Sequence, residues 1–138
     1  MLLSTIVDPI SQLLGNWSFN INIWSILLRL VLAVLFGGAI GVERATKRHA
    51  AGFRTYILVC VGATLAMLVN QYTVVTFDSG DATRLGAQVI SGIGFLGAGS
   101  ILITSRSQVR GLTTAAGLWA SACVGLAIGA GFYTAAIV

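Results

Sequence analysis

Four long runs of apolar residues, separated by short polar or charged segments, dominate the pattern of this chain. We expect helices at about 23–43, 54–72, 84–104 and 111–134, because these runs approach the roughly 20 residues that a helix needs to cross hydrocarbon. Residues 1–22 mix apolar and polar positions, so we expect a separate segment at the membrane interface. The pattern predicts an all-α integral membrane protein, a small bundle of about four transmembrane helices.

The run at 84–104 combines apolar length with many small and polar residues, which is typical of a helix that others press against. Its large aliphatic residues recur at spacings of three, four and seven and share one face, which we expect to meet lipid. These residues are Leu85, Val89, Ile93, Leu96 and Ile103. We therefore expect this helix to be the central one of the bundle.

Glycines recur at helical spacing in three of the four runs, and we interpret them as positions of close helix packing. They are Gly37, Gly41, Gly92, Gly94, Gly97, Gly99, Gly117 and Gly125. The stripes on the third and fourth helices are expected to pack against each other. Residues 92–97 also match GxGxxG, but no acidic residue follows about twenty positions later, so we do not expect dinucleotide binding.

Composition supports the membrane interpretation and the charges predict its orientation. The chain is 57% hydrophobic and only 9% charged, with a net charge of +4. The basic residues gather in two loops, 43–54 and 104–111, which the positive-inside rule places in the cytoplasm, with both termini outside. Because the basic residues are explained as a topology signal, we expect no nucleic-acid partner. Cys60 and Cys123 lie in apolar runs and are expected to be reduced.

Arg29 is the first candidate for a functional residue, because it lies about 9 Å inside the first helix at 1.5 Å per residue. A guanidinium at such depth needs a partner. We expect an outer polar cluster of Arg29 with Gln88, Ser91 and either Asp78 or Asp81. The alternative is that Arg29 extends toward the headgroups without a specific role.

At the inner face, Glu43 is the one carboxylate among several cations. It is expected to form a cytoplasmic-face network with Arg44, Arg54 and Arg110, bracing the two loops; direct ligand binding is the alternative. Two loop aspartates do not make a metal cage, so we expect no metal and no cofactor. Nothing places the single His49 beside a nucleophile, and we do not expect an enzyme.

Four ordered blocks, at residues 29–44, 51–55, 88–99 and 109–119, resemble the membrane domain of the MgtC/SapB family. The chain departs from the family pattern at Ala45 and Ala82, and we do not expect the soluble C-terminal domain of longer members. The resemblance carries over the following positions: Arg29, Glu43, Arg44, Arg54, Gln88, Ser91, Gly92, Gly94, Gly97, Gly99, Gly111, Thr113, Thr114 and Trp119.

The resemblance implies a small bacterial inner-membrane protein, of a family linked to growth under magnesium limitation and to virulence. One hypothesis is a regulator that acts through contacts with itself or with another membrane complex. The alternative is a small oligomeric transporter or channel for a cation or small solute, with Arg29, Gln88, Ser91, Thr113 and Thr114 along the path. Besides the lipid bilayer, the expected partner is a second copy, with a dimer favoured.

Overall fold

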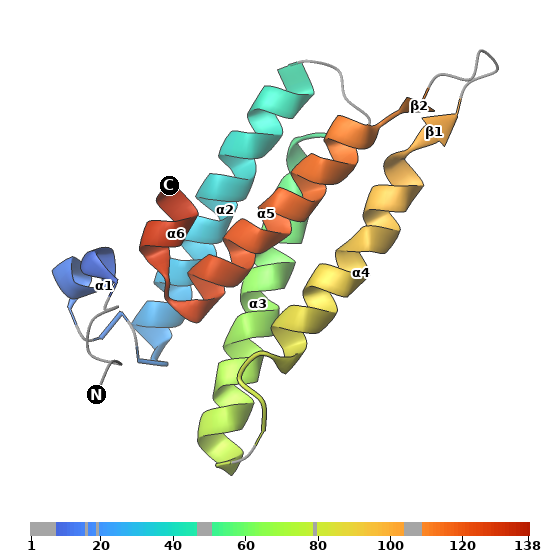
Figure 1. The fold of residues 1–138 in the computed structure, drawn as a ribbon. Coiled ribbons are helices and arrows are strands. Elements are labelled where there is room, and N and C mark those ends of the chain that lie inside the picture. The colour runs from blue at the N-terminus through green and yellow to red at the C-terminus, as the bar shows by residue number, and fades with distance from the viewer. Residues whose placement is uncertain (1–7, 16, 19, 47–50, 79, 104–108) are drawn as a thin grey trace.

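The computed structural model describes residues 8–15, 17–18, 20–46, 51–78, 80–103 and 109–138. Its long helices are α2 (Ile23–Thr46), α3 (Phe53–Phe77), α4 (Arg84–Ser100) and α5 (Leu112–Ala130), and they run side by side (Figure 1). The short elements are α1 (Pro9–Leu14), α6 (Tyr133–Ile137) and the paired strands β1 (Leu102–Ile103) and β2 (Val109–Arg110). The prediction of an all-α bundle is confirmed.

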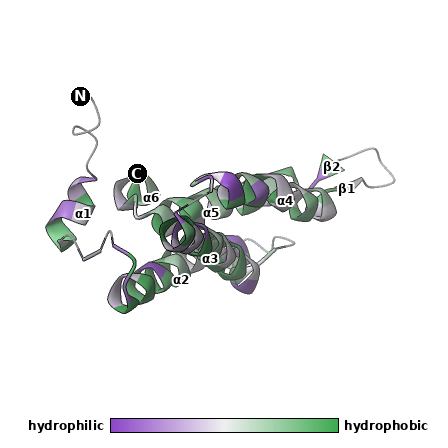
Figure 2. Ribbon diagram, turned by 90° about the horizontal axis from the view of Figure 1, so that it is seen from below, coloured by the Kyte–Doolittle hydropathy of each residue, from purple (hydrophilic) through white to green (hydrophobic). Residues whose placement is uncertain are grey.

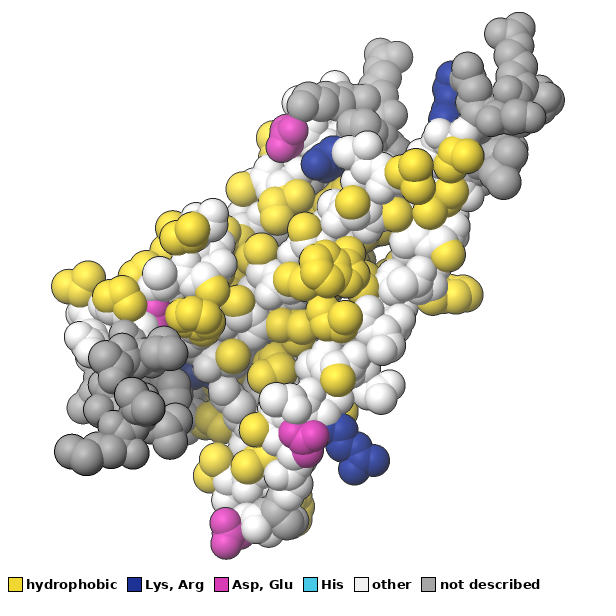
Figure 3. All heavy atoms as spheres, in the orientation of Figure 1, with side chains coloured by type: hydrophobic (Ala, Val, Ile, Leu, Met, Phe, Trp, Pro, Cys, Tyr) yellow, Lys and Arg dark blue, Asp and Glu magenta, His cyan; other side chains and the backbone are white. Residues whose placement is uncertain are grey.

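Three of the long helices, α2, α3 and α5, are long and apolar enough to cross a membrane. The fourth, α4, has 17 residues and rises about 26 Å, at the short end of the spanning range. It ends at Ser100, earlier than the expected residue 104. Residue 104 itself lies outside the described part of the chain. On the face seen in Figure 3, charged side chains occupy the two ends and hydrophobic side chains the middle.

Helices α3 and α5 form the centre of the bundle, because each packs against the other three long helices, and the expectation that residues 84–104 would be central is wrong. Helix α3 packs against α2, α5 and α4, whereas α4 lies at the edge against α5 and α3. The end-on view in Figure 2 places α2 and α4 on opposite sides of the bundle. Glycine lets helices approach closely, and here the glycine-bearing helices α2 and α5 both approach α3.

The glycines of α2 and α5 explain this arrangement. A Cβ atom at Gly37 would lie 2.9 Å from the Cβ of Cys60, and one at Gly41 would lie 2.8 Å from the Cα of Phe53. A Cβ at Gly117 would lie 2.6 Å from the hydroxyl of Tyr56. The glycine stripe of α5 therefore faces α3, not α4 as the sequence suggested.

Helix α4 turns Val89 and Ile93 inward, opposite to the expected lipid-facing orientation, whereas Leu96 is exposed as expected. Ile93 is only 7% exposed and joins the core with Ala122, and Val89 packs against that core. The α5 surface that α4 meets is made of small residues such as Ala115, which lies 3.5 Å from the position a Cβ on Gly97 would take. The side chains that fill the space between α4 and α5 must therefore come from α4, and Ile93 and Val89 supply them.

Candidate functional site

The guanidinium of Arg29 lies wholly buried at one end of the bundle, where it joins several elements. One terminal nitrogen donates hydrogen bonds of 2.8 Å to the side-chain oxygen of Gln71 on α3 and of 2.8 Å to the carbonyl of Gly129 on α5. The other donates to the carbonyl of Ser18 at 3.0 Å, and Nε donates to the hydroxyl of Tyr133 at 3.3 Å. Burial of this charge is compensated by charge-assisted hydrogen bonds.

The carbonyl of Ser18 is the point where the N-terminal segment is attached to this cluster. It accepts hydrogen bonds from Arg29, from the hydroxyl of Tyr133 at 3.0 Å and from the hydroxyl of Ser25 at 2.8 Å. Gln71 also donates to the carbonyl of Ala130 at 3.2 Å. We call Arg29, Gln71, Tyr133 and Ser18 the arginine cluster. It holds Ser18, the turn after α5, and the C-terminal part of α3 in one arrangement.

Asp8 anchors the other side of the same N-terminal segment. Its carboxylate accepts hydrogen bonds from the backbone N–H groups of Tyr133 at 2.8 Å and Thr134 at 3.1 Å, and from the Thr134 hydroxyl. Burial alone would raise the pKa of Asp8, but these hydrogen bonds to the charged form outweigh it and hold the pKa below its ordinary value. The carboxylate thus fastens the segment to α6.

The expected cluster of Arg29 with Gln88, Ser91 and an aspartate is not assembled. Gln88 and Ser91 are exposed on α4, and α3 lies between that helix and α2. Asp78 ends α3 in a left-handed conformation, and Asp81 accepts hydrogen bonds from the Thr83 N–H and hydroxyl. The alternative, an arginine extended toward headgroups, does not hold either, because the guanidinium is fully buried.

The sequence interpretation missed the polar residues of α3. Asn70 is 3% exposed, donates to the carbonyls of Asp81 and Ala82, and accepts from the N–H of Leu85, so it fixes the connection into α4. Adjacent Gln71 serves the arginine cluster. Two amide side chains within an apolar run are the sequence signal that could have revealed these polar contacts, because polar groups in spanning helices face protein.

Other buried polar groups in the bundle are used to join α3 to α5. The Thr64 hydroxyl donates to the carbonyls of Cys60 and Gly125, each at 2.9 Å. The Ser121 hydroxyl donates to the carbonyl of Tyr56 at 3.1 Å. These contacts pair the interior polar groups with protein.

At the opposite end, the residues of the expected cytoplasmic-face network lie near the C-terminus of α2, at the start of α3 and in strand β2. Glu43, Arg54 and Arg110 are exposed, and Arg44 is half-buried, with a buried Nε that has no hydrogen-bond partner. Their bracing role stays a prediction. Lys47, Arg48 and Arg106 lie outside the described residues.

The remaining family-motif positions fall into three groups: a turn glycine, two threonines with a tryptophan, and three exposed glycines of α4. Gly111 adopts a φ of 98°, and a Cβ there would overlap the carbonyl of Ser100, so this turn requires glycine. Thr114 is buried, whereas Thr113 and Trp119 are exposed. A Cβ atom added at any of three α4 glycines would have no atom within 4 Å; these are Gly92, Gly94 and Gly99.

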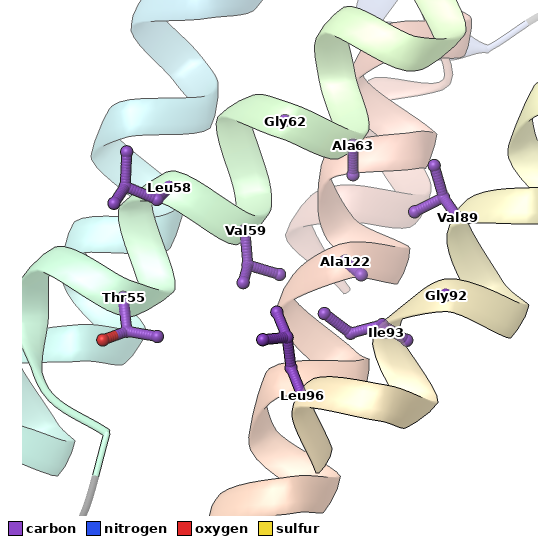
Figure 4. A pocket seen from close by; sticks show the side chains of 10 residues that line it. All are labelled: Thr55, Leu58, Val59, Gly62, Ala63, Val89, Gly92, Ile93, Leu96 and Ala122. Carbon is purple, nitrogen blue, oxygen red and sulfur yellow. The ribbon is translucent and has the colours of Figure 1, made fainter. Parts of the chain in front are cut away.

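An apolar cavity of about 420 Å³ lies between α3 and α4, with α5 as its floor (Figure 4). Leu58 and Val59 line it from α3, Val89 and Leu96 from α4, and Ala122 from α5. The lining is aliphatic apart from Thr55 and two glycine backbones. Within the described residues, no three His, Cys, Asp or Glu side chains form a group that could hold a metal ion.

An apolar helical bundle with charges at its ends, as seen here, defines an integral membrane protein. The chain belongs to the MgtC family, whose family model matches residues 30–138.

Three relatives illustrate the match. The chain is 44% identical over 112 residues to "Putative magnesium transporter YhiD" of Escherichia coli K12, covering 78% of this chain and 52% of the relative. It is 40% identical over 138 residues to "Protein SapB" of Bacillus subtilis, covering 96% and 53%. It is 49% identical over 106 residues to "Protein MgtC" of Brucella abortus, covering 77% and 43%. The chain thus spans about half the length of these relatives, and no solved structure matches it.

Proposed function

We propose that this protein is a bacterial membrane regulator, tied to adaptation to low magnesium, that works through contacts with other membrane proteins or a second copy. One observation carries the proposal: α4 presents Gln88 and Ser91 on the face opposite its buried Ile93. Gln88 lies about 6 Å and Ser91 about 10 Å from the start of α4, at 1.5 Å per residue. Polar side chains at that depth favour a protein neighbour over hydrocarbon.

The composition of this face suits a close helix contact. Ser91, Gly94 and Ala98 form a strip of small exposed residues along one side of this face, where a partner backbone can approach, and the 83% exposed Phe95 projects beside the strip. The Gln88 amide carries both donors and an acceptor and can pair with its own copy across a two-fold axis. A homodimer through α4 is therefore the favoured assembly, and another membrane complex is the second kind of partner.

The interior gives less support to transport through a single copy. Arg29, Thr64 and Ser121 make hydrogen bonds within the protein, and the cavity between α3 and α4 is apolar. A polar path would need the exposed Gln88 and Ser91 of several copies. The name of the Escherichia coli relative, a putative magnesium transporter, keeps this oligomeric transporter as the second candidate.

Flux through the purified protein in sealed liposomes, followed separately for Mg²⁺, K⁺ and protons, distinguishes the two functions. We expect no flux above that of protein-free liposomes. Flux that is abolished by Gln88→Leu and preserved in Ala39→Leu would overturn the regulator proposal. Ala39 is a matched control because it is exposed on α2, away from the α4 face.

A genetic test addresses regulation directly. In a strain that lacks this gene and grows poorly at low magnesium, the wild-type chain should restore growth. Ser91→Leu should fail at equal protein level, because its side chain blocks close approach at α4, whereas Ala39→Leu should succeed. Equal rescue by both variants would argue against the α4 face as the functional contact.

A further inference from the structure

The cavity between α3 and α4 is a groove that opens sideways from the bundle. Leu58 and Leu96 form its lips and are 70% and 47% exposed. Gly62 on α3 and Gly92 on α4 also line it, and a Cβ atom at either would meet no atom within 4 Å. The groove is therefore open space between two helices of a membrane protein, facing the surrounding bilayer.

Aliphatic lining selects a hydrocarbon occupant. Side chains such as Val59 and Val89 offer no hydrogen-bond partners, so water gains nothing by filling the groove (Figure 4). A helix with side chains is about 10 Å across, and a single acyl chain is much narrower. A groove of about 420 Å³ between two helices therefore suits an acyl chain better than a helix.

Charge at one end of the groove indicates the headgroup. Arg54 is exposed and lies four residues before Leu58, on the same face of α3. Arg110 is exposed in β2, and its strand partner Leu102 follows the end of α4 that carries Leu96. Two cations therefore flank the end of the groove at the basic loops. The opposite end, near the start of α4, carries two acidic residues, Asp78 and Asp81, and one cation, Arg84.

The groove has the depth of one leaflet. From Arg54 to Ala63, the last α3 residue in the lining, α3 rises about 14 Å at 1.5 Å per residue. Half of a 30 Å hydrocarbon core is about 15 Å. We propose that this groove binds one acyl chain of an anionic phospholipid from the leaflet on the side of the basic loops, with its phosphate beside Arg54 and Arg110.

Native mass spectrometry of the delipidated full chain in detergent tests the site with two probes, phosphatidylglycerol and phosphatidylcholine. We expect phosphatidylglycerol to bind at least tenfold more tightly. Arg54→Gln should weaken its binding about fivefold, the contribution of one basic residue near an anionic surface. Arg84→Gln is the matched control, because Arg84 is exposed at the other end of the bundle, and should change binding less than twofold.

The acyl-chain part of the site is tested by filling the groove. Gly92→Leu should reduce phosphatidylglycerol binding at least tenfold, and Gly62→Leu should do the same from the opposite wall. Gly94→Leu is the control for lipid binding on the same helix, because Gly94 also borders open space but lies outside the lining. Because Gly94 lies on the proposed α4 contact face, Ala39→Leu is the control for dimer mass. Circular dichroism establishes that the variants are folded, and the Gly62 variant replaces Gly92→Leu if the latter does not fold.

Three results would overturn the proposal. Equal binding of the two lipids shows that no headgroup site exists. Equal binding by Gly92→Leu, Gly62→Leu and Gly94→Leu shows that the groove holds no lipid chain. A loss of dimer mass in the two groove variants, with lipid binding intact, would assign the groove to a second copy instead.

Discussion

Replacing Arg29 with methionine should destabilise the protein by about 3 kcal/mol. Methionine fills much of the same volume but cannot donate, so the carbonyl of Gly129 and the side-chain oxygen of Gln71 lose their 2.8 Å partners. Ser18 keeps donors from Tyr133 and Ser25. A buried acceptor without a donor costs about 1–3 kcal/mol, which applies in full to the Gly129 carbonyl and in part to the half-buried oxygen of Gln71, and relief of the buried charge offsets part of that cost.

The assay is unfolding in mixed dodecyl sulfate and mild-detergent micelles, followed by far-ultraviolet circular dichroism. Arg29→Lys keeps the charge but not the planar fork, so we expect roughly half of the loss. Adding Gln71→Leu to Arg29→Met should cost less than the sum of the single changes, by about 1 kcal/mol, because the two side chains share a hydrogen bond.

Arg84→Met is the control, because Arg84 is exposed at the start of α4, and its cost should stay within about 0.5 kcal/mol. The reasoning fails if Arg29→Met unfolds at the same detergent fraction as Arg84→Met. In that case the buried hydrogen bonds would not contribute to stability.

Three further substitutions test other contacts. Gly125→Ala should lower the unfolding free energy by more than about 2 kcal/mol in the same assay, because its Cβ would overlap the carbonyl of Cys60; Gly94→Ala, in open space, should be neutral. Gly111→Ala should lower the melting temperature, since its left-handed φ alone costs a non-glycine residue about 1–2 kcal/mol. The pKa of Asp8 is lowered in the folded state, so its stabilisation should be complete above about pH 5 and lost as pH falls through the folded pKa. Melting temperature should therefore fall more steeply in acid for the wild type than for Asp8→Asn, which keeps the other carboxylates; parallel curves would contradict the hydrogen-bonded carboxylate.

The apolar runs determined the number and approximate position of the long helices. Length and hydropathy are local properties, and a helix in hydrocarbon must satisfy its own backbone, so the bundle follows from the sequence. Arg29 was also identified from sequence, because a cation within an apolar run must find partners wherever the chain folds.

The tertiary arrangement decided which partners Arg29 found. Gln71 and Gln88 are both amides inside apolar helices, and nothing local distinguishes them as neighbours of Arg29. The distinction arises because the glycines of α2 and α5 allow both helices to approach α3, which leaves α4 at the edge. Helix order in the bundle thus placed Gln71 in the cluster and Gln88 on the outside.

The orientation of α4 was likewise undetermined by its own sequence. A helix with one bulky and one small face can turn either face inward, and the surface it meets selects between them. Helix α5 offers Ala115 and Ala122, so Ile93 fills the space between the helices. The outward polar face and the groove beside it follow from this choice, because packing density depends on both surfaces of a contact.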